Sequence, residues 1–144
     1  MTALWLERAE GGDPFAQYQL GWCYETGEGV ERDLEWAFRW YLRAARQGHP
    51  RAQYHYGLAC STGVPGVPWN RVEAFKWLTL SAKAGLREAI DALKVFKLPA
   101  EEREQGAAAA SEFRAAPEPQ TFPYPKASAR SAPPVRTSQL SLRL

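Results

Sequence analysis

Apolar side chains recur every three to four residues in two stretches of the chain, a spacing typical of helices with one buried face. In the first stretch they follow the i, i+3, i+4, i+7, i+8 pattern: Ala37, Trp40, Tyr41, Ala44 and Ala45. The same pattern recurs over residues 74–82. Alanines allow a neighbouring helix to approach closely, and the larger rings fill the remaining space. The pattern therefore predicts buried helices over about 33–47 and 70–84.

These two stretches belong to an internal repeat of 36 to 37 residues. The tripeptide Ala-Gln-Tyr at 16–18 recurs 36 residues later at 52–54, whereas later matches are spaced by 37. The additional residue falls in a glycine-rich loop, at 27–30 in the first copy and 63–67 in the second. Repeat proteins tolerate insertions best in such loops. The repeat therefore predicts two similar structural units.

Each copy predicts a pair of helices. The first helices span about 14–26 and 50–61, each with proline at its first position and glycine just after its end. Asp33 and Asn70 occupy equivalent positions and predict the N-caps of the second helices. Three single helices are predicted over about 2–10, 87–97 and 100–114.

Glycine occupies the middle of both first helices, at Gly21 and Gly57. A glycine there costs about 0.5–1 kcal/mol, so its repetition predicts a helix crossing too close for a side chain. Lys94 replaces this glycine in the next partial copy and predicts that the array ends there. The predicted structural core of the repeats comprises Ala16, Gly21, Tyr24, Ala37, Trp40, Tyr41, Ala44, Ala52, Gly57, Ala74, Trp77 and Ala82.

Taken together, these positions resemble the Sel-one-like repeat (SLR), a relative of the tetratricopeptide repeat. The first copy matches the family pattern at Ala9, Gly12, Ala16, Leu20, Gly21, Tyr24, Gly27, Gly29, Val30, Asp33, Ala37, Trp40, Tyr41, Ala44, Ala45 and Gly48. The resemblance covers about residues 3–98 and implies an all-α fold, an α-solenoid or α/α superhelix. Two full hairpins would be flanked by half-repeats and followed by a C-terminal capping helix. It also implies an adaptor surface in protein complexes, mostly in bacteria.

The composition changes near residue 115. All six tryptophans precede it, whereas six of the eleven prolines follow it, among many serines and alanines. Proline removes backbone donors and interrupts regular elements, and this segment has little apolar surface to bury. We therefore expect an SLR domain over 1–115 and a disordered, basic tail over 116–144.

Charge and cysteine content exclude several classes of protein. A net charge of +2 gives no electrostatic case for nucleic acid binding. No apolar run approaches the ~20 residues that span a bilayer, and the N-terminus lacks a signal-peptide pattern. Two cysteines, Cys23 and Cys60, are too few for a disulfide-rich scaffold and indicate a reducing compartment. We therefore expect a cytoplasmic monomer that binds neither nucleic acid nor membranes.

The sequence carries no pattern typical of catalysis or of a bound metal or cofactor. The two histidines, His49 and His55, have no C-x-x-C or H-E-x-x-H context. We expect His49 to be a solvated turn residue, and Cys23 and Cys60 to be buried free thiols. We predict no enzyme activity and no cofactor, although a catalytic triad is spatial and stays open.

Candidate partner-binding side chains lie on the first helices, which line the concave face in related solenoids. They are spaced i, i+4, i+7, away from the buried stripe: Tyr18, Trp22 and Glu25, with Tyr54, Leu58 and Ser61 as equivalents. They predict a non-catalytic protein–protein interaction module, an adaptor or scaffold whose groove takes a protein or peptide of unknown identity. The alternative is that these rings only pack against the next hairpin.

Two further alternatives stay open. The chain could be a small-ligand binder or an enzyme of the cell envelope, such as a β-lactam-binding SLR protein, although those proteins carry a cysteine pair in every repeat. Arg39, Arg43 and Arg46 share one face of the second helix. We interpret them as a solvated face, with a site for an acidic partner as the alternative.

Overall fold

The computed structural model describes residues 2–118, and within them it contains seven α-helices and an isolated β-bridge between Val64 and Val67. The helices are α1 (Thr2–Glu10), α2 (Pro14–Thr26), α3 (Leu34–Arg46), α4 (Pro50–Thr62), α5 (Arg71–Lys83), α6 (Arg87–Val95) and α7 (Ala100–Glu112). The predicted helices are confirmed, with bounds within two residues of those expected. In this part of the chain, no helix has the length and apolar character needed to cross a bilayer.

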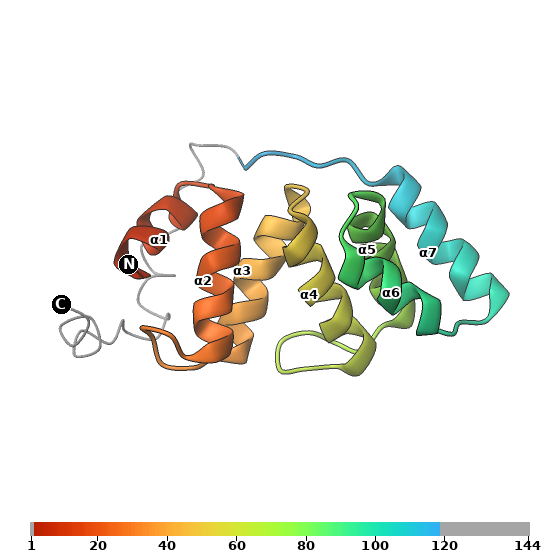
Figure 1. Cartoon of the computed structure of the whole chain (residues 1–144), viewed down its shortest axis with the longest axis horizontal. Coiled ribbons are helices and arrows are strands. Elements are labelled where there is room, and N and C mark those ends of the chain that lie inside the picture. The colour runs from red at the N-terminus through yellow and green to blue at the C-terminus, as the bar shows by residue number, and fades with distance from the viewer. Residues whose placement is uncertain (1, 119–144) are drawn as a thin grey trace.

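The helices form an array of stacked hairpins, an all-α solenoid. Successive helices from α1 to α6 pack on one another, and α7 returns to pack on α5. Figure 1 shows α2, α4 and α6 on the near side of the array, with α3 and α5 behind them and α1 and α7 at the two ends. One side of the molecule is therefore formed by the first helices of successive repeats.

Side-chain caps begin the helices of both repeats. The Asp13 carboxylate accepts a hydrogen bond from the Phe15 amide at 2.9 Å, which satisfies a free donor at the start of α2. Asp33 caps α3 and Asn70 caps α5, each by accepting from the backbone amide three residues later, at 3.1 and 3.0 Å. The predicted caps are thus confirmed.

Close crossings join the two helices of each hairpin. A Cβ added at Gly21 would lie 2.7 Å from Cδ1 of Tyr41, and one at Gly57 would lie 3.1 Å from Cγ of Leu78. The glycines therefore stand where a neighbouring side chain leaves little or no room. A further crossing of this kind, which the repeat pattern did not predict, joins α7 to α5, because a Cβ at Gly106 would lie 2.7 Å from the ring of Phe75.

The core follows the two apolar stripes. Tyr24 and Tyr41 are fully buried, and Trp40 and Trp77 are 4% and 3% exposed. Ala82, in contrast, is only half-buried. The expectation of buried free thiols is confirmed for Cys23 and Cys60, and burial raises the pKa of the Cys60 thiol to about 12.

After α7 the chain turns back along one edge of the array, as the blue segment in Figure 1 shows. We call residues 113–118 the strap. The Phe113 ring packs edge-on against Trp77 with centroids 5.5 Å apart, and the Ala116 amide donates to the Arg46 carbonyl at 3.2 Å. The prediction of disorder from residue 116 onward is therefore wrong for residues 116–118, because backbone and side-chain bonds hold them on the array. The rest of the predicted tail lies outside the described residues.

Candidate interaction sites

The predicted partner-binding residues all lie on α2 and α4, and we call the surface they form the α2/α4 face. It comprises Tyr18, Trp22, Glu25, Tyr54, Leu58 and Ser61. Trp22 is 40% exposed, whereas the other five side chains are half-buried. The surface therefore presents one large exposed ring beside side chains that are already partly packed.

Aromatic rings and imidazoles stack beneath this face. Tyr18 stacks on His49 with ring centroids 4.7 Å apart, and Tyr41 stacks on His55 at 4.9 Å. Tyr54 lies edge-on to His55 at 5.6 Å. Tyr18 and Tyr54 therefore pack against neighbouring rings, as the alternative interpretation expected, while Trp22 keeps much of its surface open.

The expectation that His49 is a solvated turn residue is wrong. Its ring is half-buried, and its Nδ1 accepts a hydrogen bond from the Ala52 amide at 3.2 Å, so it caps α4. Burial is the main cause that lowers the pKa of His49, which favours the neutral ring that this bond requires. The repeat held a signal for this role, because His49 aligns with the cap residue Asp13 of the first copy.

Glu25 connects the ring cluster to the polar part of the face. Its Oε2 accepts a hydrogen bond from the Tyr41 hydroxyl at 2.7 Å and lies 3.8 Å from Nδ1 of His55. Burial raises the pKa of Tyr41, and the bond to the carboxylate raises it further, so the hydroxyl stays a donor. Burial lowers the pKa of His55 against the opposing effect of Glu25. Neither Tyr41 nor His55 stood out in the sequence as a functional residue.

Two open hollows lie on the α2/α4 face. The first, about 540 Å³, is lined by residues that include Phe15, Tyr18, His49 and Arg51. The second, about 290 Å³, is lined by residues that include Glu25, Phe38, His55, Leu58 and Ser61. Four of the six predicted residues thus line one hollow or the other. Trp22 and Tyr54 line neither of these two hollows, although both lie on the same helices.

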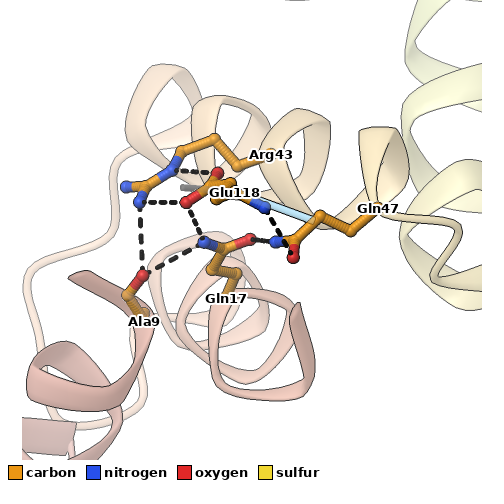
Figure 2. A network of polar contacts seen from close by, with 5 residues as sticks. All are labelled: Ala9, Gln17, Arg43, Gln47 and Glu118. Atoms are coloured by element: carbon orange, nitrogen blue, oxygen red, sulfur yellow. Dashed lines mark hydrogen bonds and ion pairs between the residues drawn. The ribbon is translucent and has the colours of Figure 1, made fainter. Parts of the chain in front are cut away.

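A second polar site holds the end of the strap, as Figure 2 shows. Arg43 donates from Nε to Oε1 of Glu118 and from Nη2 to Oε2, both at 3.0 Å. Nε2 of Gln17 donates to the same Oε2 at 3.0 Å. The Glu118 amide donates to Oε1 of Gln47 at 3.4 Å. We call Gln17, Arg43 and Gln47 the strap site.

The strap site corrects the interpretation of the three arginines on α3. Arg39 and Arg46 are exposed, as expected for a solvated face, but the Arg43 side chain is only 15% exposed and pairs with Glu118. No local pattern predicted this pair, because its members lie 75 residues apart. A single acidic residue in a proline-rich segment gives no signal of where it docks.

One strap-site residue, Gln17, has an equivalent in the second repeat, whereas Arg43 is particular to the first. Gln17 donates to the Ala9 carbonyl at 3.0 Å, and its equivalent Gln53 donates to the Ala45 carbonyl at 3.2 Å. Arg43, in contrast, is replaced in the second repeat by Leu80. The second repeat therefore keeps the buried amide but lacks the cation that binds a carboxylate.

Comparison with known proteins accounts for the repeat geometry. The family model described as the Sel1 repeat matches residues 14–49 and 50–86, which correspond to the hairpins α2/α3 and α4/α5. The chain belongs to the Sel1 repeat family. This assignment agrees with the resemblance seen in the sequence and with the stacked hairpins of the structure.

Related proteins are known from yeast and from bacteria. The chitin synthase regulator SKT5 of Saccharomyces cerevisiae is 45% identical over 47 residues, which cover 33% of this chain and 7% of that protein. The crystal structure of a Sel1 repeat protein from Oxalobacter formigenes matches with a TM-score of 0.56 and 32% identity, over 72% of this chain and 44% of that one.

A protective antigen of uropathogenic Escherichia coli, which displays an SLR fold, matches with a TM-score of 0.61 and 30% identity, over 75% of this chain and 24% of that one. This Sel1 repeat chain therefore spans less than half the length of each of the three proteins. Because both yeast and bacterial proteins match, a bacterial source stays a prediction.

Proposed function

We propose that this Sel1 repeat protein is a non-catalytic interaction module, an adaptor or scaffold, whose α2/α4 face binds a peptide or protein partner. The observation that carries the proposal is the position of Trp22. This exposed ring lies about one helical turn from Tyr18, which lines the first hollow, and one turn from Glu25, which lines the second. Exposed tryptophans beside pockets are frequent energetic centres of protein interfaces.

The relatives support a regulatory role through protein contacts. One of them, SKT5, is a chitin synthase regulator, and its name describes action on another protein. The face itself combines aromatic surface with separate polar groups, the Glu25 carboxylate in one hollow and the Arg51 guanidinium in the other. Such a surface suits a partner segment that carries apolar side chains with polar groups at its two ends.

The polar contacts of the face support a non-catalytic role, because two of its titratable groups hold structural hydrogen bonds. Glu25 accepts the Tyr41 hydroxyl, and Nδ1 of His49 caps α4. The ring of His55 stacks flat on Tyr41, with an interplanar angle of 11°. A general base needs an atom free to reach a substrate proton, and the Tyr41 hydroxyl and the Ala52 amide occupy one such atom of Glu25 and of His49.

A cytoplasmic location and a monomeric state are part of this proposal. Buried free thiols at Cys23 and Cys60 support a reducing compartment, because cysteines in an oxidising compartment tend to form disulfide bonds. Cell fractionation checks the location, and light scattering of the purified chain checks its mass.

Photo-crosslinking from single positions tests the interaction face. A benzophenone amino acid is placed at position 22, and as a matched control at position 69, where Trp69 is 58% exposed and lines neither hollow. We expect one partner to crosslink from position 22 and not from position 69, and we expect Tyr54→Ala to reduce the yield. Circular dichroism confirms that each variant is folded. Equal yields from the two positions would contradict the proposal.

A further inference from the structure

The groups around Glu118 have the geometry of a carboxylate receptor. The side chains of Arg43 and Glu118 are only 15% and 16% exposed, so their contact is largely shielded from water. Two parallel bonds from a guanidinium fit the two oxygens of a carboxylate, and a neutral amide cannot accept both. Gln17 adds a donor to one of these oxygens at 3.0 Å. The site therefore distinguishes glutamate from glutamine.

Contacts that do not involve the strap hold these donors in place. The Arg43 guanidinium lies 4.2 Å from the ring centroid of Trp40, and its Nη2 also donates to the Ala9 carbonyl at 3.2 Å. Nε2 of Gln47 donates to Oε1 of Gln17 at 2.9 Å, which orients the Gln17 amide with its donors toward the carboxylate. A receptor held by its own framework keeps its shape when its ligand leaves, and such preorganisation favours binding.

The strap itself binds as an extended peptide with two anchors. Phe113 packs edge-on against Trp77 at 5.5 Å, and Glu118 enters the carboxylate receptor five residues later. Between the anchors, the Ala116 amide donates to the Arg46 carbonyl at 3.2 Å. Backbone bonds of this kind do not depend on the side chains of the ligand. The strap therefore presents an aromatic residue, followed five positions later by a glutamate, to this edge of the array.

We propose that the strap site is a peptide-binding site for an extended segment of a partner protein that carries a glutamate, and that residues 113–118 are its built-in ligand. The partner's glutamate replaces Glu118 on Arg43 and Gln17, and the strap is displaced. The inference goes beyond the proposed function, because none of the strap-site residues lines either hollow of the α2/α4 face. The strap and the partner compete for one receptor.

The charge of the receptor determines which partner side chain it binds. The receptor is one guanidinium with neutral amides, so it selects a single carboxylate. A tethered ligand acts at an effective concentration in about the millimolar range, so a free peptide competes poorly with an intact strap. Weakening the strap therefore exposes the receptor to an added peptide.

The experiment uses the full chain and a fluorescent peptide with the sequence of residues 113–118, blocked at both ends, together with a control peptide that ends in glutamine. Binding by fluorescence anisotropy is measured for the wild type, for Glu118→Gln, and for Glu118→Gln combined with Arg43→Leu. Leucine is the matched replacement, because Leu80 occupies the equivalent position of the second repeat. Circular dichroism verifies the fold of each variant.

We expect Glu118→Gln to bind the glutamate peptide about tenfold or more tightly than the glutamine peptide, because hydrogen bonds to a charged group are the stronger ones. We expect the wild type to bind the glutamate peptide about tenfold more weakly than Glu118→Gln does, and Arg43→Leu to remove the preference. Equal affinity for the two peptides, or a preference that survives Arg43→Leu, overturns the proposal.

A second measurement covers weak binding. In amide NMR spectra, the side-chain signals of Gln17 and Gln47 shift in Glu118→Gln, and millimolar glutamate peptide returns them toward their wild-type positions. Signals that do not move with the peptide overturn the proposal. The strap of a second copy of the chain is the other candidate occupant of the site, and light scattering of the variants tests for it. A doubled mass would show that this second strap fills the site and would overturn the proposal of a partner peptide.

Discussion

Replacing Gly21 by alanine tests one of the closest helix crossings in the solenoid. The new Cβ would lie 2.7 Å from Cδ1 and 2.8 Å from Cε1 of Tyr41, and 3.0 Å from the Ala37 carbonyl oxygen. Carbon atoms pack best at about 3.5–4.0 Å, so Tyr41 must move by roughly 1 Å. Its ring is fully buried, stacked on His55 and bonded through its hydroxyl to Glu25, so it has no free space to enter.

The expected magnitude is a difference between two effects. Alanine in place of glycine stabilises a helix interior by about 1 kcal/mol. Overpacking a filled core costs about 1–3 kcal/mol, and disturbing the bond between the Tyr41 hydroxyl and the carboxylate costs about 1.5–3 kcal/mol more. We therefore expect Gly21→Ala to lower the free energy of unfolding by about 1.5–5 kcal/mol.

The second repeat supplies the matched control. A Cβ at Gly57 would lie 3.1 Å from Cγ of Leu78, a side chain that needs to shift by only a few tenths of an ångström. The gain in helix propensity then nearly offsets the strain, so Gly57→Ala should change stability by less than about 1 kcal/mol. Urea unfolding followed by far-UV circular dichroism measures both variants. A Gly21→Ala protein as stable as the wild type, or a larger loss from Gly57→Ala, would refute the packing argument.

Three further predictions follow from the core, the strap and a cap. Trp40→Ala should destabilise the protein by about 3–5 kcal/mol in urea unfolding, as the loss of large buried rings does. Truncation after Ala115 should lower the melting temperature relative to truncation after Glu118, because only the first removes the shielded ion pair. Burial lowers the pKa of His49 below its unfolded value of about 6.5, so stability should fall as the pH drops below that value. His49→Asn retains a cap and should reduce this pH dependence in thermal melts at pH 7.5 and 5.5, leaving the part due to His55, whose pKa burial also lowers.

Local patterns were sufficient to predict the helices and the caps of α3 and α5. The 36- to 37-residue repeat aligned Asp33 with Asn70, and each caps its helix at a comparable distance. Mid-helix glycine is costly in isolation, so its recurrence pointed to the crossings that the structure contains. These features depend on neighbours within one hairpin, where sequence spacing determines which side chains meet.

The strap and the ring cluster could not be predicted in the same way. The bond between Arg43 and Glu118 joins residues 75 positions apart, and proline-rich composition favoured disorder over docking. His55 is stacked on Tyr41 from the next hairpin, a contact that depends on how two repeats pack. Spacing along one helix identified the α2/α4 face but not the side chains that support it from below.

The buried amides of Gln17 and Gln53 contribute to the stiffness of the array. Each fastens the start of one hairpin to the last turn of the helix before it, through the carbonyls of Ala9 and Ala45. Apolar contacts are non-directional and allow neighbouring helices to shift, whereas a hydrogen bond has a preferred direction. Because this hydrogen bond occurs in both repeats, it restrains the angle between helices at two joints, α1 with α2 and α3 with α4. A surface that extends over two such joints therefore meets its target as a rigid template.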